Sequence, residues 1–401
     1  MPLETKPAKL TKWKSVRHNP AMWSAYRLGL FSYSLMVFLL VVSCHPKTDQ
    51  IQVIINALPV YGEESIVDLE KLYRIDVTEI SLFNKQNEYQ GFVDFDKNNN
   101  LYVLDRYEGT ITVFEEKGRL VNRFGRRGQG PNEFQEAHFM VISNNRIYVF
   151  HGRNELKILD LQGEYIAGDV IHIYGDNPLR LQAVGNLIYV LKGKTDRTFT
   201  KLDLILGTYS RDFSGGKDLF EYTYPLGLRG YPCWEWMLIL KSGEFFFPED
   251  NHHKYSITRY DKSGKPDLIF GRKYQVKNYS EDARTRLTST YEKAVEKGQM
   301  TILKAPPIVR TMFQDLKENI WVISGETYED NMNPNFENTV DIFNRKGEWL
   351  SSFKTTKISK NSFYHHGKIY KVRPIDTEDF SQFIDVYGMQ FKRKGHDGRN
   401  P

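Results

Sequence analysis

The stretch "NNNLYVLDRYEGTITVFEEKGRLVNRFG", Asn98–Gly125, decides the fold. It reads as a polar turn, a strand, a connector, a second strand, a glycine-containing turn and a third strand. The stretch "NNRIYVFHGRNELKILDLQGEYIAGDV", Asn144–Val170, repeats this order almost element for element. A recurrence of strands and turns at this spacing indicates a fold built from copies of one antiparallel unit.

Four weaker copies follow, and the apolar triplets of the six copies begin at Leu101, Ile147, Ile188, Phe245, Ile320 and Ile369. Their successive spacings are 46, 41, 57, 75 and 49 residues. Three of the five spacings lie near the ~40 to 50 residues of a propeller blade. A short apolar strand such as "GFVDF" or "HFMVIS" also precedes the units. We therefore predict an all-β fold, a six-bladed β-propeller of four-stranded antiparallel blades.

Three segments outside the repeat complete this prediction. Residues 66–83 have strand character, and we expect them to complete the last blade and so close the ring. Residues 214–232, between units three and four, are rich in Gly and aromatic residues and read as a loop. Ser280–Met300 predicts a helical insertion between blades four and five, with Ser280 as its cap. Its apolar face, which we expect to lie on the propeller, consists of Ala283, Leu287, Tyr291 and Ala294.

The net positive charge of the chain comes from residues 1–43. The chain has 55 Lys and Arg against 50 Asp and Glu, a net charge of +5. Residues 1–43 contain six basic groups and one acid, so the remainder has 49 of each sign. A body without net positive charge offers no electrostatic footprint for phosphates, and we exclude nucleic acid as a partner.

An apolar run, Leu28–Ser43, follows this basic segment and ends at Cys44. Its 16 residues fall short of a membrane-spanning helix, which needs about 20. We interpret it as the core of a signal peptide, with Met22 as an alternative start. The residues before the cysteine resemble the bacterial lipobox, and this resemblance implies lipid attachment to Cys44 and cleavage before it. An uncleaved signal anchor and a buried cysteine are the alternatives.

The chain is therefore divided into a signal peptide (1–43), a lipidated N-terminus and tether (44–65), a propeller (66–391) and a basic C-terminal tail (392–401). The predicted partner of the N-terminus is a membrane, reached through the lipid, and the predicted location is the bacterial cell envelope rather than the cytoplasm. His45 stands where an inner-membrane retention signal has Asp, so the resemblance favours the outer membrane.

The segment "FGRRGQGPNEFQ", Phe124–Gln135, predicts a tight crossover to the next blade. Its glycines permit positive φ, and Pro131 stops strand pairing. The residues that define this crossover loop are Gly125, Arg126, Arg127, Gly128 and Gly130. Gly and Arg together also suit an anion, so a phosphate cradle is the alternative, although the segment lacks a Walker lysine.

The "FG..G.GP.EF" pattern of this loop, with "D...N.LYV.D" before it, resembles NHL-related six-bladed β-propeller proteins of bacteria, many of them secreted or lipid-anchored. "DLKENIWV", Asp315–Val322, is similar to the later blades of the same family. Related propellers include metal-dependent lactonases and lyases, whose sites need polar residues converging on the axis. An enzyme of this kind is therefore one hypothesis.

The candidates for an axial pocket on inner strands are Asp94, His138, Arg180, Glu235 and Arg310. Two guanidiniums suit a carboxylate or sulfate better than a metal, so we predict an anion or glycan pocket with no metal, cofactor or catalytic residue. "DFDKNNNLYVLD" predicts an Asx-rich turn rather than a calcium loop. The adjacent His365 and His366 are expected to point to opposite faces.

The sequence thus predicts a lipid-anchored binding or scaffold protein, whose partner is a protein or a glycan or other anionic ligand on a propeller face. A metal-dependent lactonase- or lyase-like enzyme and an extracytoplasmic sensor module are the two alternatives.

Overall fold

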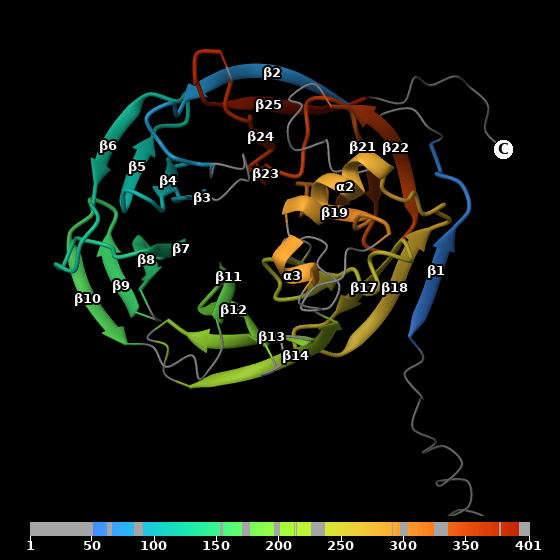
Figure 1. Cartoon of the computed structure of the whole chain (residues 1–401), viewed down its shortest axis with the longest axis horizontal. Coiled ribbons are helices and arrows are strands. Elements are labelled where there is room, and N and C mark those ends of the chain that lie inside the picture. Colours follow the sequence, from blue (N-terminus) through green and yellow to red (C-terminus); the bar gives the residue numbers. More distant parts are fainter. Residues whose placement is uncertain are drawn as a thin grey trace, which may run out of the picture. The chain divides into compact units, whose positions relative to one another are not determined.

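The computed structural model describes residues 51–61, 66–83, 91–152, 155–170, 177–195, 201–211, 213, 215–225, 237–290, 292–296, 304–324, 336–376 and 378–392. In this part of the chain the strands form six sheets, five of four strands and one of five. The sheets are arranged as blades around a ring (Figure 1), with the first strand of each blade nearest the centre. The predicted six-bladed β-propeller is confirmed.

Blades 1 to 3 each contain four consecutive antiparallel strands, ordered from the centre outwards. Blade 1 consists of β3 (Phe92–Phe95), β4 (Leu101–Asp105), β5 (Thr110–Phe114) and β6 (Leu120–Phe124). Blade 2 consists of β7 (Ala137–Ser143), β8 (Arg146–His151), β9 (Glu155–Asp160) and β10 (Tyr165–Val170). Blade 3 consists of β11 (Asn177–Val184), β12 (Leu187–Thr195), β13 (Lys201–Ser210) and β14 (Gly216–Pro225).

Blades 4 and 5 follow the same plan, and blade 4 carries a fifth strand on its outer side. Blade 4 consists of β15 (Leu238–Ile239), β16 (Phe245–Phe247), β17 (Ser256–Tyr260) and β18 (Pro266–Arg272), with β1 (Gln52–Asn56) beyond β18. Blade 5 consists of β19 (Val309–Gln314), β20 (Ile320–Ser324), β21 (Asn338–Phe343) and β22 (Trp349–Thr355).

Blade 6 joins the two ends of the propeller. It consists of β23 (Ser362–His365), β24 (Lys368–Val372), β25 (Phe383–Phe391) and, outermost, β2 (Val67–Asp76). β2 pairs antiparallel with β25, from Val67 opposite Phe391 to Asp76 opposite Phe383. The predicted closure by an N-terminal strand is therefore confirmed.

The repeat read from the sequence coincides with the second strand of every blade. All six apolar triplets lie on second strands, and their first residues are at most 1% exposed. These strands contribute to six hydrophobic clusters, each shared by two neighbouring blades. One cluster joins Ile75 of blade 6 to Leu101 of blade 1, so the core runs around the whole ring. Burial on both faces explains why these triplets are the strongest signal in the sequence.

Two expectations about connecting segments were wrong. Residues 216–225, read as part of a loop, form β14. Phe220 and Tyr222 alternate with polar residues as in a strand, and the centre of the Phe220 ring lies 5.3 Å from that of Phe247 in blade 4. Part of the expected tether is also ordered, since β1 pairs parallel with β18. Alternation in "QVIIN" turns Ile54 towards the cluster between blades 4 and 5.

Asx turns begin the second strands of blades 1 and 5. Asp96 accepts hydrogen bonds from the backbone N–H groups of Asn98 and Asn100 and from the side chain of Asn100. In blade 5, Asp315 bonds the N–H groups of residues 317 and 319 and the amide of Asn319 in the same way. The carboxylate of Asp96 is thus used within its own turn, which agrees with the predicted Asx-rich turn rather than a calcium loop.

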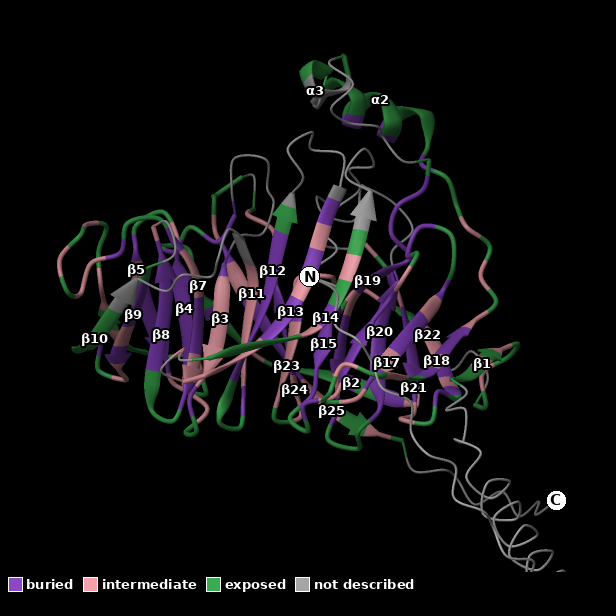
Figure 2. Cartoon of the chain, turned by 90° about the horizontal axis from the view of Figure 1, so that it is seen from below, coloured by how far each residue is buried: buried purple, intermediate pink, exposed green. Residues whose placement is uncertain are grey.

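The predicted insertion between blades 4 and 5 contains two helices, α2 (Glu281–Thr290) and α3 (Glu292–Glu296). The Ser280 hydroxyl accepts a hydrogen bond from the Ala283 N–H at 3.1 Å, which confirms the cap. Ala283 and Leu287 form a small buried cluster with Tyr279. Tyr291 and the Ala294 side chain lie outside the described residues. Figure 2 shows both helices beyond the ends of the strands, on one face of the ring, here called the helix-bearing face. No helix among the described residues is long and apolar enough to cross a bilayer.

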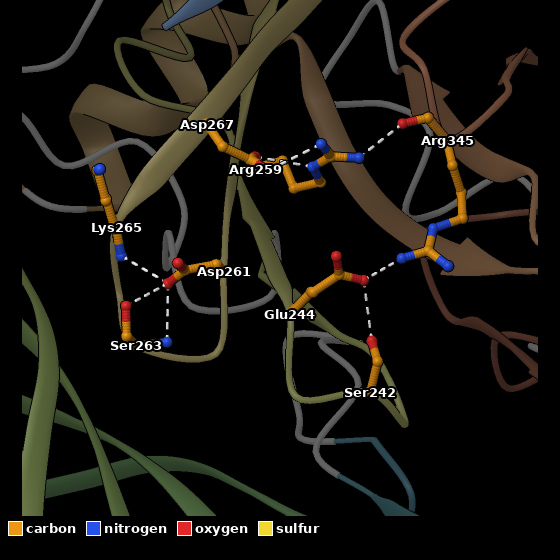
Figure 3. Close-up of polar contacts among 8 residues, drawn as sticks. All are labelled: Ser242, Glu244, Arg259, Asp261, Ser263, Lys265, Asp267 and Arg345. Carbon is orange, nitrogen blue, oxygen red and sulfur yellow. Dashed lines mark hydrogen bonds and ion pairs between the residues drawn. The ribbon is translucent and has the colours of Figure 1, made fainter. Parts of the chain in front are cut away.

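Polar side chains join blades 4 and 5 at the hairpin turns (Figure 3). Arg345, in the turn between β21 and β22, forms an ion pair with Glu244 of blade 4, shown in Figure 3. It forms a second ion pair with Glu318. Arg259 on β17 binds Asp267 through two hydrogen bonds of 2.8 Å and donates a third to the Arg345 carbonyl. These charged contacts therefore supplement the apolar cluster between the two blades.

Candidate functional site

Four of the five candidate axial residues lie on inner strands. Asp94 is on β3, His138 on β7, Arg180 on β11 and Arg310 on β19. Glu235 lies outside the described residues, as do Cys44 and Cys233. What each side chain contacts decides whether it faces a ligand or another blade.

Asp94 binds the neighbouring blade. Its carboxylate accepts hydrogen bonds from the Phe95 N–H at 2.8 Å and from the Ile142 N–H of β7 at 2.6 Å. Burial raises the pKa of Asp94 to about 6, against the lowering effect of these two bonds. The side chain therefore connects blades 1 and 2 at their inner strands.

Arg180 has a similar position between blades 3 and 4. Its Nη1 donates to the Met237 carbonyl, and Gln182 of the same strand donates to the Ile239 carbonyl at 2.7 Å. Arg310 is buried on β19. Asp94 and Arg180 thus have contacts that hold blades together, and a shared axial pocket of the five candidates stays a prediction.

His138 differs from these residues because its partner is a cation that the sequence did not single out. The Arg106 Nε–H donates to the Ala137 carbonyl at 3.0 Å, and Nη2 lies 3.3 Å from His138 Nδ1. The other imidazole nitrogen, Nε2, lies 3.0 Å from the Gly152 carbonyl. A carbonyl only accepts, so Nε2 carries the proton, and Nδ1 accepts from Arg106. Burial lowers the pKa of His138, the Arg106 charge adds to this effect, and the imidazole is neutral at pH 7.

The tight turn after β4 directs Arg106 away from the acid beside it. Buried Asp105 accepts hydrogen bonds from the N–H groups of Tyr107, Glu108 and Ser81, and neighbouring strand residues point to opposite sides. Each second strand runs antiparallel to the inner strand of its blade, so it ends on the face of the ring where the inner strand begins. The insertion between β18 and β19 directly precedes the inner strand β19 and lies on this same face. Arg106 is therefore on the helix-bearing face.

Two aromatic rings complete this group. The Arg106 guanidinium lies 5.8 Å from the centre of the Phe92 ring, and Phe92 packs edge to face against Phe139 at 4.9 Å. All four side chains are half-buried. We call Phe92, Arg106, His138 and Phe139 the Arg106 site.

The guanidinium of this site is a cation without an acid partner. In the part of the chain that the structure describes, no carboxylate forms an ion pair with Arg106, and no hydrogen bond reaches its Nη1. Burial lowers the pKa of Arg106, but a guanidinium keeps its proton in proteins. A half-buried, uncompensated cation beside apolar rings is suited to a carboxylate or sulfate that carries a ring of its own.

The crossover loop lies next to this site and contains its own anion. Glu133 accepts hydrogen bonds from Arg126 Nε at 2.6 Å and from the Gly130 N–H at 2.9 Å, and these bonds, the Gly130 bond most, lower the pKa of Glu133. A Cβ at Gly128 would lie 2.0 Å from its carboxylate. Because Glu133 occupies the place that a phosphate would need, these contacts support a structural crossover.

A second observation explains how the loop is fixed to blade 2. The Lys157 Nζ donates to the carbonyls of Gly130 and Glu133 at 2.5 Å each. Gly125, at the start of the loop, has φ of +82°, and a Cβ there would lie 2.8 Å from the Gly109 carbonyl. Arg127 is exposed. The loop that connects β6 to β7 is therefore bonded to blade 2, and its conformation leaves no room for a side chain at Gly125.

Among the described residues, no group of three His, Cys, Asp or Glu side chains is placed to hold a metal ion. One expectation about histidines was wrong. The rings of His365 and His366 do not point to opposite faces but stack, with their centres 4.3 Å apart. The reason is that His366 has φ of +44°, which interrupts the alternation of the strand.

Comparison with known proteins agrees with the fold. The chain is a six-bladed β-propeller, and the model of the DUF5128 family, described as "6-bladed beta-propeller", matches residues 88–223. The matched span contains the whole Arg106 site and the crossover loop. No curated protein matches the sequence.

Several solved structures match the chain at low sequence identity. A Bacteroides fragilis protein, provisionally named as exported, is 12% identical, with a TM-score of 0.49 over 86% of this chain and 100% of that one. Virginiamycin B lyase from Staphylococcus aureus is 8% identical, with a TM-score of 0.40 over 80% and 99%. The calcium-binding protein regucalcin from Agrobacterium tumefaciens is 10% identical, with a TM-score of 0.42 over 86% and 98%. These values transfer no activity or ligand to this chain.

Proposed function

We propose that the protein is a binding module of the bacterial cell envelope that holds an anionic ligand at the Arg106 site. One observation carries this proposal. The guanidinium of Arg106 is half-buried and, within the described part of the chain, has no carboxylate partner. Keeping a cation in this environment has a desolvation cost that an anionic ligand would offset.

The neighbours of Arg106 indicate what kind of anion fits. Two hydrogen bonds orient the guanidinium and leave Nη1 for a ligand, and Phe92 and Phe139 offer half-buried ring surface beside it. A uronic acid or a sulfated sugar combines an anionic group with an apolar ring face. This class of glycan is therefore the proposed ligand.

Hydrogen bonds between neighbouring blades support a binding role. Polar side chains hydrogen-bond to neighbouring blades: on inner strands Asp94 bonds to blade 2 and Arg180 to blade 4, and in the turn after β16 Asn251 bonds to the backbone of Val309 in blade 5. Such contacts hold the helix-bearing face in one shape, which lowers the entropic cost of binding.

Attachment to the outer membrane through a lipid on Cys44 is the second part of the proposal. It is supported by the uncharged run that ends at Ser43 and by the lipobox resemblance. Cys44→Ser should shift the protein from the membrane fraction to the soluble fraction of the envelope. Unchanged retention of this variant in the membrane would mean that the apolar run is an uncleaved signal anchor.

The ligand is tested by calorimetric titration of the protein with three probes. These are an oligogalacturonate, a sulfated oligosaccharide and a neutral oligosaccharide of the same length. The proposal expects binding of an anionic probe that weakens with added salt, and no binding of the neutral one. Equal affinity for charged and neutral probes would overturn the role of Arg106.

The metal-dependent lactonase or lyase remains the competing hypothesis. Metal analysis of the purified protein separates the two, because the enzyme requires a stoichiometric divalent ion whose removal abolishes an activity. A sensor would additionally require a stable protein partner. A pull-down of the membrane-bound protein with and without the anionic probe tests that requirement.

A further inference from the structure

The N-terminal arm, residues 51–61, lies along the outer side of blades 4 and 5. Figure 1 shows β1 at the rim, outside β18. β1 pairs with β18 from Gln52 opposite Leu268 to Asn56 opposite Arg272. Further on, the N–H groups of Val60 and Tyr61 donate to carbonyls of β22 at 2.8 Å each. The arm is therefore attached to two blades.

Asn56 fixes the register of this attachment. Its Nδ2 donates to the Gly271 carbonyl at 2.8 Å and to the Gly347 carbonyl at 2.9 Å, and its Oδ1 accepts from the Trp349 N–H at 3.2 Å. Because alternate strand residues face opposite ways, a fixed register also fixes which side chains of the arm point outwards.

The outward side chains of the arm are apolar. Ile54 packs against the cluster between blades 4 and 5, whereas Val53 and Ile55 are 60% and 48% exposed. Leu58 and Val60, beyond the strand, are 81% and 63% exposed. Of the fifteen large hydrophobic side chains exposed in the described part of the chain, six lie in these eleven residues. An edge strand with this composition promotes association unless something covers it.

The proposed attachment at Cys44 would bring a membrane close to the arm. The apolar run ends at Ser43, so residue 44 lies at the bilayer surface whether a lipid on Cys44 or an uncleaved anchor holds it there. Seven residue steps separate Cys44 from Ile51, a reach of at most about 25 Å. This argument rests on the membrane attachment in the proposed function, and it holds for both forms of attachment.

We propose that the arm is a membrane-contact surface, whose outward Ile, Val, Leu and Tyr side chains lie in the boundary between lipid headgroups and acyl chains. Apolar side chains of a surface-bound segment enter this layer to a depth of about 5 to 10 Å. The propeller then stands on the rim of blades 4 and 5. Its helix-bearing face, with the Arg106 site, opens sideways to the compartment rather than towards the bilayer.

The test compares two labelled positions in the full chain, reconstituted in phosphatidylethanolamine and phosphatidylglycerol vesicles. Val53→Cys and Val121→Cys are each made with Cys233→Ser and labelled with an environment-sensitive fluorophore. Val121 is the matched control because it is a 54% exposed valine on the outer strand of blade 1. Vesicles that contain doxyl-labelled lipid should quench the probe at position 53 at least twofold and leave the probe at position 121 unchanged.

Three other results overturn the inference. If the protein stays on the vesicles but quenching is equal at the two positions, or absent at both, the arm is not a specific membrane contact. This result would refute the inference and leave the membrane attachment intact. Failure of the wild-type protein to sediment with vesicles would refute the attachment as well. A blue shift at position 53 that depends on protein concentration and not on lipid would mean that a second copy of the chain covers the arm.

A variant without labels provides an independent measurement. Val53→Thr and Ile55→Thr together keep β-branched residues in β1 and remove outward apolar surface, and Leu120→Thr with Val121→Thr is the matched pair on β6. This measurement applies where Cys44→Ser releases the protein from the membrane, as the lipid anchor predicts. With Cys44→Ser in all proteins, the arm pair should then reduce binding to the same vesicles about tenfold, because each lost apolar contact weakens interfacial binding. Equal binding of the two pairs would overturn the inference.

Discussion

Arg106 Nη2 lies 3.3 Å from Nδ1 of His138, and His138 Nε2 in turn lies 3.0 Å from the carbonyl of Gly152. The carbonyl determines the tautomer of the imidazole, and the tautomer provides an acceptor for the guanidinium. A backbone group of blade 2 thereby orients a cation of blade 1. The Arg106 site is thus built across a boundary between blades.

His138 is accordingly a positioning residue. His138→Leu removes the acceptor for Arg106 and should weaken binding of the anionic probe about tenfold, the value of one lost hydrogen bond to a charged group. His138→Gln supplies a side-chain oxygen as acceptor and should recover part of the affinity. His253→Leu, at a 69% exposed histidine, is the control and should bind like wild type. A merely structural role of His138 would be indicated by equal losses in the Leu and Gln variants.

Blades 4 and 5 share a buried ion pair that should matter for stability. Arg272 Nε donates to Asp341 at 2.9 Å, and the Tyr255 hydroxyl donates to the same carboxylate oxygen at 2.7 Å. Asp341→Ala would remove the buried partner of the Arg272 guanidinium, whose side chain is 14% exposed, and should cost about 3 kcal/mol of unfolding free energy, the lower end of the range for broken buried pairs.

The control for this variant is Asp267→Ala, which removes the 43% exposed partner of Arg259. An exposed pair should contribute less than about 1 kcal/mol. Urea unfolding of both variants measures the difference. Equal shifts of the two midpoints would contradict the stabilising role of the buried pair.

Stability should fall in mild acid because of His365. Burial, followed by the charges of His366 and two lysines, lowers the pKa of His365 to about 4, and the ring stacks on Phe95 at 3.8 Å. In the unfolded chain a histidine takes up its proton near pH 6.5. Between these values the unfolded state binds more protons, so the free energy of unfolding declines as the pH falls from 6.5 towards 4.

His365→Gln should remove this part of the pH dependence. It keeps a side chain able to donate to Asn99 Oδ1, which lies 3.0 Å from His365 Nε2. After allowance for screening by solvent, the difference in unfolding free energy between pH 7 and pH 4.5, measured by urea unfolding, should be about 1 kcal/mol smaller in the variant than in wild type. His253→Gln is the control, and an unchanged pH dependence in His365→Gln would show that other groups cause the decline.

A side chain at Gly125, the first glycine of the crossover loop, should lower the stability of the protein. Gly125→Ala combines φ of +82° with a contact of 2.8 Å to the Gly109 carbonyl, whereas Gly185→Ala has φ of +58° and no atom within 4 Å. The first variant should lose about 2 to 3 kcal/mol and the second about 1 kcal/mol, because only the first adds a clash to the backbone strain. Thermal unfolding measures both, and equal losses would contradict the packed conformation of the loop.

The sequence predicted those parts of the fold that repeat. Triplets such as the one at Leu101 are buried on both faces of second strands, and the Asp96 turn recurs at Asp315, so both leave a periodic pattern. β14 was missed because its strand begins at Gly216, directly after Gly215, and this pair of glycines reads as loop. β1 was missed because its partner, β18, lies more than 200 residues away in the sequence.

The candidate site was predicted only in part. His138 was named for its place on an inner strand, but Arg106 was not, because it follows a second strand, and only the turn after β4 brings it to the inner strand of the next blade. The signal available in the sequence was a basic residue directly after "LYVLD", where blade 2 has Gly152 after "IYVFH". That difference between two otherwise similar units marks where blade 1 departs from the repeat.

The most direct test of the central claim is a calorimetric titration of wild type, Arg106→Gln and Arg119→Gln with the anionic oligosaccharide that binds wild type. Arg119 is the control because it is 75% exposed at a hairpin turn and paired with Glu115. The Arg106 variant should bind about 10- to 100-fold more weakly, the loss expected for one or two charge-assisted hydrogen bonds, and the Arg119 variant should bind like wild type. Equal affinity of Arg106→Gln and wild type, or no binding of any anionic probe by wild type, would contradict the claim.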